Sequence, residues 1–203
     1  MSEVRANALE RLVPVLPVVA AAAPDVDRHA RFPEATLTAL RDAGLMGLVT
    51  PTAHGGLGGT PSDAAIVVER IARACASSAM VVAMHYAGAA VIAAHGRADT
   101  NREIAAGRHL STLAFSEAGS RSQFWAPVST ARLEGDDVVL DADKSWITSA
   151  SHAAAYVWSS LPAAAEGASS IWLVERDRPG LDVPRPFDGL GLRGNDSTPV
   201  RAR

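Results

Sequence analysis

The spacing of apolar residues changes near residue 111, and this change constrains the fold more than any other feature of the sequence. Before it, apolar residues recur at helical spacing, as in Leu37, Leu40 and Leu45. After it, short apolar runs alternate with turn residues. Helices followed by strands favour an α+β architecture over a doubly wound parallel sheet. We predict an N-terminal all-α domain over residues 1–111 and an antiparallel, β-barrel-like domain over residues 112–203.

Several residues mark the ends of the predicted helices. Pro33 suits a first helical turn, where its missing N–H costs no hydrogen bond, and Gly44 lies near a helix end. Thr60-Pro61-Ser62-Asp63 offers an N-cap followed by an acidic residue where the helix dipole favours one. Residues 80–94 are apolar on more than one face, which predicts a helix covered on two sides.

The second half has the pattern of short strands separated by turns. Turn residues gather at 135–137, 141–143 and 178–180. The predicted strands are residues 128–132, 138–140, 145–147, 155–159, 171–174 and 181–183. We find no internal repeat in the sequence.

Composition and charge argue against several classes of protein. The 203 residues carry a formal net charge of -3 without a basic stripe, so we expect no nucleic-acid partner. Cys75 is the single cysteine and the 6 histidines lack metal-ligand spacing, so we expect neither a disulfide framework nor a metal site. We interpret His85 and His95 as helix packing or cap residues. No Gly-x-Ser-x-Gly motif of a hydrolase occurs.

An apolar run near the N-terminus, residues 12–23, needs to be distinguished from a secretory signal. Acidic residues cancel the basic ones before it, Pro14 and Pro17 interrupt it, and it is too short to span a bilayer. We expect an alanine-rich opening helix, no membrane span and a cytoplasmic location.

A glycine cluster, His54-Gly-Gly-Leu-Gly-Gly-Thr60, could be mistaken for a phosphate-binding loop. No Lys-Ser/Thr pair follows it at the spacing that such a loop requires. We therefore expect a structural role, in which glycines allow positive φ and close backbone approach before a helix.

Two segments of the second half carry the strongest functional signal. Leu113-Ala-Phe-Ser-Glu-Ala-Gly-Ser-Arg-Ser122 is followed by Lys144-Ser-Trp-Ile-Thr148. Together they resemble the two flavin-contacting segments of the acyl-CoA dehydrogenase family, which follow the patterns Thr-Glu-Pro-x-x-Gly-Ser-Asp and Lys-x-Trp-Ile-Thr. Ser116 stands for Thr, Ala118 for Pro and Gln123 for Asp.

Other segments resemble the same family in the same order. They are Asp27-Arg28, Phe32-Pro33, residues 40–51, the glycine cluster at 54–59 and residues 189–200. The resemblance therefore runs from about residue 27 to residue 200, and this collinearity is more specific than any one motif.

The resemblance implies an FAD site and assigns a role to each matching position. Backbone groups of Leu113, Phe115 and Ser116 would meet the edge of the flavin ring. Trp146 and Ile147 would cover a ring face, and the Thr148 hydroxyl would hydrogen-bond its redox centre. Ser122 would lie near both the pyrophosphate and the acyl-CoA substrate. Taken singly, without the resemblance, Trp146 is better interpreted as a sheet core residue and Ser122 as a turn residue; the two motifs in order favour the flavin site.

Departures from the family pattern affect the details of the site. Ala118 loosens a turn that proline would stiffen, and Arg121 brings a cation that could hold a phosphate or point to solvent. Phe124-Trp125 adds bulk that would reshape a substrate pocket. Glu117 corresponds to a structural residue, and His152 could lie near a flavin.

The reaction that the resemblance implies is α,β-dehydrogenation of an acyl-CoA thioester. In this family the carboxylate that removes the α-proton comes from a C-terminal helical bundle, so we assign no catalytic residue within the chain and expect the base beyond Arg203. Two alternatives stay open: a flavin-dependent monooxygenase on the same scaffold, and a non-catalytic remnant that binds a partner. A natural short protein, a split subunit and an incomplete gene product are also all open.

The resemblance also implies the partners of the chain. We expect acyl-CoA or a related small molecule as substrate. We further expect a homo-oligomer or an association with a subunit that carries the C-terminal bundle.

Overall fold

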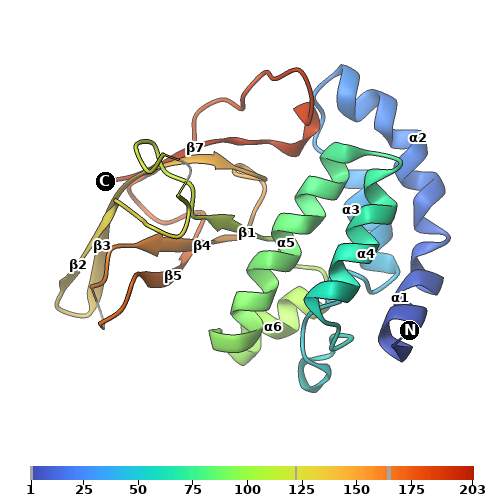
Figure 1. The fold of residues 1–203 in the computed structure, drawn as a ribbon, viewed down its shortest axis with the longest axis horizontal. Coiled ribbons are helices and arrows are strands. Elements are labelled where there is room, and N and C mark those ends of the chain that lie inside the picture. Colours follow the sequence, from blue (N-terminus) through green and yellow to red (C-terminus); the bar gives the residue numbers. More distant parts are fainter. Residues whose placement is uncertain (1, 122, 164–165) are drawn as a thin grey trace.

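A computed structural model of the chain describes residues 2–121, 123–163 and 166–203. The first half is helical, and the α+β class predicted from the sequence is confirmed (Figure 1). The helices are α1 (Glu3–Leu12), α2 (Val15–Arg28), α3 (Glu34–Asp42), η1 (Thr52–His54), α4 (Pro61–Ala72), α5 (Ala76–His95) and α6 (Ala98–Ala105). We call this part the helical half.

The second part, which we call the β half, contains the strands and one short 3-10 helix. These elements are β1 (Ser111–Ala114), β2 (Thr130–Glu134), β3 (Asp137–Ile147), β4 (Ala155–Ser160), β5 (Ser170–Glu175), β6 (Leu181–Asp182), η2 (Arg193–Asn195) and β7 (Thr198–Ala202). They form one sheet of order β1-β4-β5 and another of order β2-β3-β7-β6. Within the described residues these are two open sheets and not a closed barrel, and β1 pairs with β4 in parallel.

Strand β3 corrects one prediction made from the sequence. Residues 141–143 were expected to form a turn, but β3 continues through them. The reason is that Asp141 and Asp143 point outward and pair with Arg203, at 3.0 and 2.8 Å, while Ala142 between them is buried. The alternation of a half-buried strand is therefore kept, and a distant arginine offsets the low strand propensity of aspartate. Strands β1 and β7 were not predicted.

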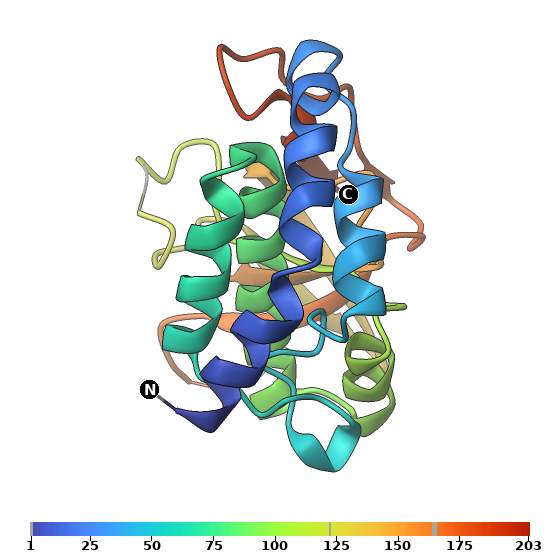
Figure 2. The same cartoon turned by 90° about the vertical axis from the view of Figure 1, so that its right-hand side faces the viewer.

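Helix α5 lies between the other helices and the first sheet (Figures 1 and 2). It contacts α4 on one side and β1 and β4 on the other, as its apolar faces predicted. Gly88 makes the close approach to β1 possible, because a Cβ atom there would lie 3.0 Å from the Cβ of Ser111. By length and composition α5 could cross a membrane, but its most apolar 18-residue window is 56% buried within the fold. It is thus the central core helix of the chain.

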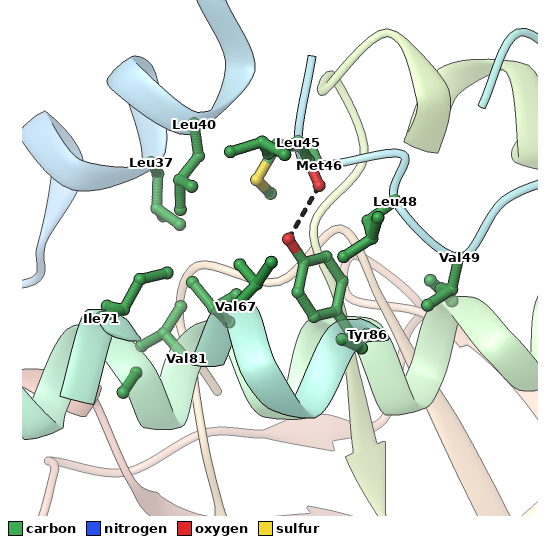
Figure 3. Packing of buried hydrophobic residues seen from close by; sticks show 14 of the residues in the cluster. Leu37, Leu40, Leu45, Met46, Leu48, Val49, Val67, Ile71, Val81 and Tyr86 are labelled. Atoms are coloured by element: carbon green, nitrogen blue, oxygen red, sulfur yellow. Dashed lines mark hydrogen bonds between the residues drawn. The ribbon is translucent and has the colours of Figure 1, made fainter. Parts of the chain in front are cut away.

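The core of the helical half consists mainly of buried apolar side chains. Leu40, Leu45 and Leu48 are fully buried beside α4 and α5 (Figure 3). The one polar tip drawn there, the Tyr86 hydroxyl, donates a hydrogen bond of 2.8 Å to the Leu45 carbonyl (Figure 3). Each buried polar group of this kind costs free energy unless it finds a partner.

The ends of the helices follow the predicted signals. Pro33 precedes α3, and Gly44, just after it, has φ +68. Thr60 and Asp63 form a capping box at the start of α4, and the Asp63 carboxylate also contacts Arg5 at 2.9 Å. The Thr60 backbone and side-chain donors are the main reason that the pKa of Asp63 is lowered to about 2.

The apolar run at residues 12–23 lies in two helices that meet at a bend of 53°. Val15 and Val19 of α2 are buried in the helical core. The alanine-rich segment is thus a packed helix, as predicted.

The glycine cluster has the structural role expected for it. Gly55 and Gly58 have φ +87 and +65, and a Cβ atom on Gly56 would lie 2.1 Å from the Thr50 carbonyl oxygen. Only glycine fits this turn into α4.

Candidate functional site

The two motif segments lie side by side at one end of the β half. The Thr112 hydroxyl donates to the Thr148 carbonyl at 2.8 Å, and the Ser145 amide donates to the Ser116 carbonyl at 2.8 Å. The Ala118 amide reaches the Asp143 carbonyl at 3.1 Å. The end of β1 and the end of β3 therefore form one surface, although some thirty residues separate them in the sequence.

Trp146 is the most unusual residue of this surface. It has φ +58, and the register between β3 and β7 shifts between Lys144 and Ile147. A left-handed backbone at a bulky residue is costly and turns the side chain out of the sheet. Trp146 is 67% exposed while both Lys144 and Ile147 are buried. The reading of Trp146 as a sheet core residue is thus wrong.

The other predicted site residues differ in how deeply they are buried. Ile147 and Thr148 are buried, and the Thr148 hydroxyl lies 3.3 Å from the Ser197 hydroxyl. Leu113 and Phe115 are half-buried against the core of the helical half. Ser116 is also half-buried, whereas the predicted position Ser122 lies outside the described residues.

A buried ion pair between Glu117 and Lys144 joins the two motif segments. Glu117 and Lys144 have side chains that are 1% and 0% exposed, and the lysine ammonium donates to the glutamate. The lysine also donates to the Ser159 carbonyl at 2.6 Å, and the glutamate accepts from the Ser129 amide at 2.9 Å. Burial raises the pKa of Glu117, but hydrogen bonds from Lys144, Ser129 and the Val128 amide outweigh it and hold the pKa below its ordinary value. Glu117 is therefore a structural anion, as expected from the sequence.

One aromatic partner of Trp146 was missed in the sequence. The Phe187 ring lies 4.3 Å from the Trp146 ring, tilted by 36°. Phe187 belongs to the long loop between β6 and η2, and Pro184 and Pro186 mark that loop in the sequence. The sequence does show an aromatic residue in a proline-flanked loop, but it could not show that this residue contacts Trp146.

The histidines do not gather into a metal site. In the part of the chain that the structure describes, no three His, Cys, Asp or Glu side chains are placed to hold a metal ion. His85 is buried, where its Nε2 lies 2.9 Å from the Met46 carbonyl and its Nδ1 accepts from the Ser111 amide at 3.1 Å. Its packing role is confirmed. His95, at the end of α5, is exposed.

The surface fits the face and edge of a planar heteroaromatic ring such as a flavin. Trp146 is exposed, residues 113–116 at the end of the edge strand β1 carry backbone polar groups, and the buried Thr148 carries a hydroxyl paired with that of Ser197. A ring that is apolar on its faces and polar at its edge needs these three kinds of contact.

The family of the chain follows from comparison with known proteins. The family model described as the acyl-CoA dehydrogenase N-terminal domain matches residues 4–107, and the one described as the acyl-CoA dehydrogenase middle domain matches residues 112–203. The chain therefore belongs to the acyl-CoA dehydrogenase family.

Individual relatives agree with this assignment. A probable acyl-CoA dehydrogenase of Mycobacterium leprae is 30% identical over 186 residues, which cover 89% of this chain and 48% of the relative. The mitochondrial short-chain specific acyl-CoA dehydrogenase of Homo sapiens is 33% identical over 184 residues, which cover 86% and 44%. The chain spans about half the length of the curated relatives it matches.

A solved structure shows a similar fold with bound ligands. KijD3 in complex with FMN and dTDP-3-amino-2,3,6-trideoxy-4-keto-3-methyl-D-glucose superposes with a TM-score of 0.82 and 26% identity, covering 100% of this chain and 52% of that one. That protein thus combines this fold with a flavin and a nucleotide-linked sugar.

Proposed function

We propose that this chain forms the flavin-ring-binding part of an FAD-dependent oxidoreductase, with α,β-dehydrogenation of an acyl-CoA thioester as its parental reaction. The observation that carries the proposal is the exposed Trp146 ring on a left-handed bulge beside the end of β1. Strained backbone of this kind persists only where the surrounding structure holds it in place, and it is concentrated at active sites and ligand sites. Family membership supports the class of reaction.

Each residue of the surface has a distinct part in the proposal. Trp146 and Ile147 would cover one face of the ring, Thr148 would hydrogen-bond its redox centre, and the backbone of residues 113–116 would meet its edge. Ser122 would contact the pyrophosphate and the acyl-CoA. A bound flavin would supply the acceptor for the electrons removed from the substrate.

The proton-abstracting carboxylate is not assigned to this chain. Glu117, the carboxylate within the motif, is bound by Lys144 and Ser129 and has no face open to a substrate. A base must lie within hydrogen-bond reach of the proton it removes. We propose that it comes from beyond Arg203, and that the protein works in the cytoplasm as an oligomer or with a bundle-carrying partner.

Oxygenation is the second candidate function. KijD3 carries FMN and an amino-sugar nucleotide on this fold, which supports a substrate other than an acyl thioester. Anaerobic mixing of the flavin-loaded protein, supplied with the bundle-carrying part that would provide the base, with a panel of acyl-CoA thioesters separates the two: bleaching of the visible flavin band supports dehydrogenation. Substrate-dependent oxygen uptake by the reduced protein, without such bleaching, supports oxygenation. Failure of both leaves the non-catalytic interaction module.

The flavin site is tested by two substitutions in fluorescence titrations with FAD. Trp146→Ala should weaken binding by about tenfold, because it removes one stacked face. Thr148→Val is nearly isosteric, so it should leave affinity almost unchanged and shift the flavin reduction potential through the lost hydrogen bond. We expect weak binding or none to the 203-residue chain by itself. The variants are therefore also compared in protein supplied with the bundle-carrying part, and the ratio between variants is the informative quantity.

Trp125 provides a matched control for Trp146, because it is 63% exposed but lies in the loop between β1 and β2. Trp125→Ala should bind FAD like the parent chain. The site assignment fails if, in protein that binds FAD, Trp146→Ala binds as well as Trp125→Ala.

A further inference from the structure

A cleft of about 590 Å³ lies beside the candidate flavin surface and has no role in the function proposed above. Its walls come from the helical half, from the turn after β3 and from the loop between β6 and β7; Figure 1 shows that loop beside the end of α2. The residues used below are Phe32, His152, Arg185, Phe187, Arg193 and Asp196. A cleft of this size is within the range that holds small molecules.

The cleft shares a wall with the flavin surface. Phe187 lines the cleft and contacts the Trp146 ring. Asp196, also in the lining, precedes Ser197, whose hydroxyl is 3.3 Å from that of Thr148. A ligand in the cleft would therefore be a neighbour of the surface assigned to the flavin.

Within the cleft, His152 is held in one orientation. Its ring stacks on Phe32 with 3.8 Å between centroids and 7° between planes. Its Nδ1 lies 2.9 Å from a carboxylate oxygen of Asp196. Stacking fixes the plane of the ring and the hydrogen bond fixes its rotation, so the position of Nε2 is also fixed.

Asp196 determines where the imidazole carries its proton. The carboxylate is 6% exposed and accepts a hydrogen bond of 2.7 Å from the Ser151 amide. Because an ionised carboxylate only accepts hydrogen bonds, neutral His152 must carry its proton on Nδ1. Nε2 then presents a lone pair, and it has no partner among the described residues. A histidine oriented by a buried carboxylate is the arrangement of a proton acceptor.

The two arginines of the cleft differ in their availability. Arg193 contacts Asp188 at 2.9 Å and donates to the carbonyl oxygens of Asp27 and Arg28. Arg185 is exposed, and its side chain makes no ion pair or hydrogen bond within the described part of the chain. Arg185 is therefore the cation available to a ligand that becomes negative.

We propose that this cleft binds a phenol, with His152 as the acceptor of its hydroxyl proton and Arg185 as the partner of the phenolate oxygen. Phe32 and Phe187 provide apolar walls for an aromatic ring. The O–H bond of the ligand breaks, an N–H bond forms at Nε2, and Asp196 stabilises the imidazolium. A carboxylic acid is already ionised at neutral pH and would face both Asp188 and Asp196 without a proton to give.

The inference rests on the residues of the cleft alone, and phenol binding there requires neither bound FAD nor an acyl thioester. The test uses 3-nitrophenol, a less acidic phenol whose phenolate form absorbs visible light, at about pH 7.5, where most of the free dye is protonated and imidazoles are mostly neutral. Adding the protein should produce the phenolate band saturably. His152→Gln should lower that signal by about tenfold or more, because the proton acceptor is lost. Arg185→Gln should lower it too.

The control is His95→Gln, since His95 is an exposed histidine at the end of α5, outside the cleft. If His152→Gln fails to fold, Asp196→Asn keeps the size of the side chain and should still lower the phenolate signal. The inference is overturned if the parent chain gives no saturable signal. It is equally overturned if folded His152→Gln, or Asp196→Asn in its place, gives the same signal as His95→Gln. FAD titration of the same samples separates this outcome from failure of the proposed function.

Discussion

Of the two halves, only the β half buries both members of an ion pair among the described residues. In the helical half the centre is aliphatic, with Leu40, Leu45 and Ile71 fully buried. In the β half a charged pair, Glu117 and Lys144, is buried among serines. Apolar packing tolerates small shifts of its members, whereas a buried ion pair holds its segments in one geometry or becomes costly.

The backbone shows the same contrast. Of the non-glycine residues described with positive φ, only Ala30 lies in the helical half, while Arg121, Trp146, Ser149, Leu192 and Asp196 lie in the β half. These five sit in or beside the motif segments and the cleft. Among the described residues, strained backbone is therefore concentrated in the β half, and the one such residue of the helical half, Ala30, lines the same cleft.

The largest expected effect tests whether the ion pair is essential to the β half. Lys144→Met leaves Glu117 buried without its cation, so we expect the free energy of unfolding to fall by about 3–5 kcal/mol in urea denaturation followed by circular dichroism. Adding Glu117→Gln should restore part of the loss, because the buried charge is then removed. A loss below about 1 kcal/mol for Lys144→Met would contradict the assigned role.

Leu40→Ala is the matched substitution in the helical half, where we expect a loss of about 2–5 kcal/mol from the cavity alone. This variant should leave the flavin surface unchanged, whereas Lys144→Met should also weaken FAD binding. Equal FAD affinity in the two variants would contradict the expectation that the ion pair, and not the helical core, supports the flavin surface.

The second prediction concerns acid sensitivity at the contact between the halves. Burial lowers the pKa of His85 from 6.5 to about 4, against the hydrogen bond to Met46, and nearby His109 lowers it further. The unfolded chain therefore takes up a proton at a higher pH than the folded chain. Stability should fall by about 3 kcal/mol as the pH drops from 6.5 to 4, and the full contribution is present above 6.5.

Urea titrations at several pH values check this prediction, with His85→Gln as the comparison. Gln offers an acceptor and a donor but does not titrate, so the pH dependence of its unfolding free energy should be shallower by that amount. Parallel curves for the parent and the variant would show that His85 is not the acid-sensitive contact.

The smallest expected effect has the opposite sign. Ser149 has φ +57 and a buried hydroxyl without a partner among the described residues. Ser149→Gly removes both costs, so we expect a stabilisation of about 1 kcal/mol after the greater flexibility of the unfolded glycine is counted. Ala90→Gly in the regular helix α5 should instead destabilise by about 1 kcal/mol. Thermal unfolding of the two variants should move in opposite directions.

Much of the fold could be predicted from local patterns. The spacing of Leu37 and Leu40, the cap at Thr60 and the glycine turn before it each report on near neighbours in the chain. Such signals need no knowledge of the partner element. The two flavin-type motifs were also readable, because their residues are contiguous.

Pairings between distant residues were not readable. From the sequence alone, residues 141–143 resemble a turn. The arginines that pair with Asp143, Arg201 and Arg203, come from β7 and the residue after it. The short strand β1 looks polar, with Ser111 and Thr112, until α5 and β4 bury it. A local pattern cannot show a charge partner or a covering element that comes from elsewhere in the chain.

The sequence by itself determined the α+β class, the family resemblance and the identity of the residues proposed to meet a flavin. Only the tertiary structure decided that Trp146 faces outward, since its orientation depends on a bulge between β3 and β7. The same holds for His152, whose partners Phe32 and Asp196 come from opposite ends of the chain. Side-chain identity is a local property, whereas side-chain direction and electrostatic surroundings are set by what folding brings near.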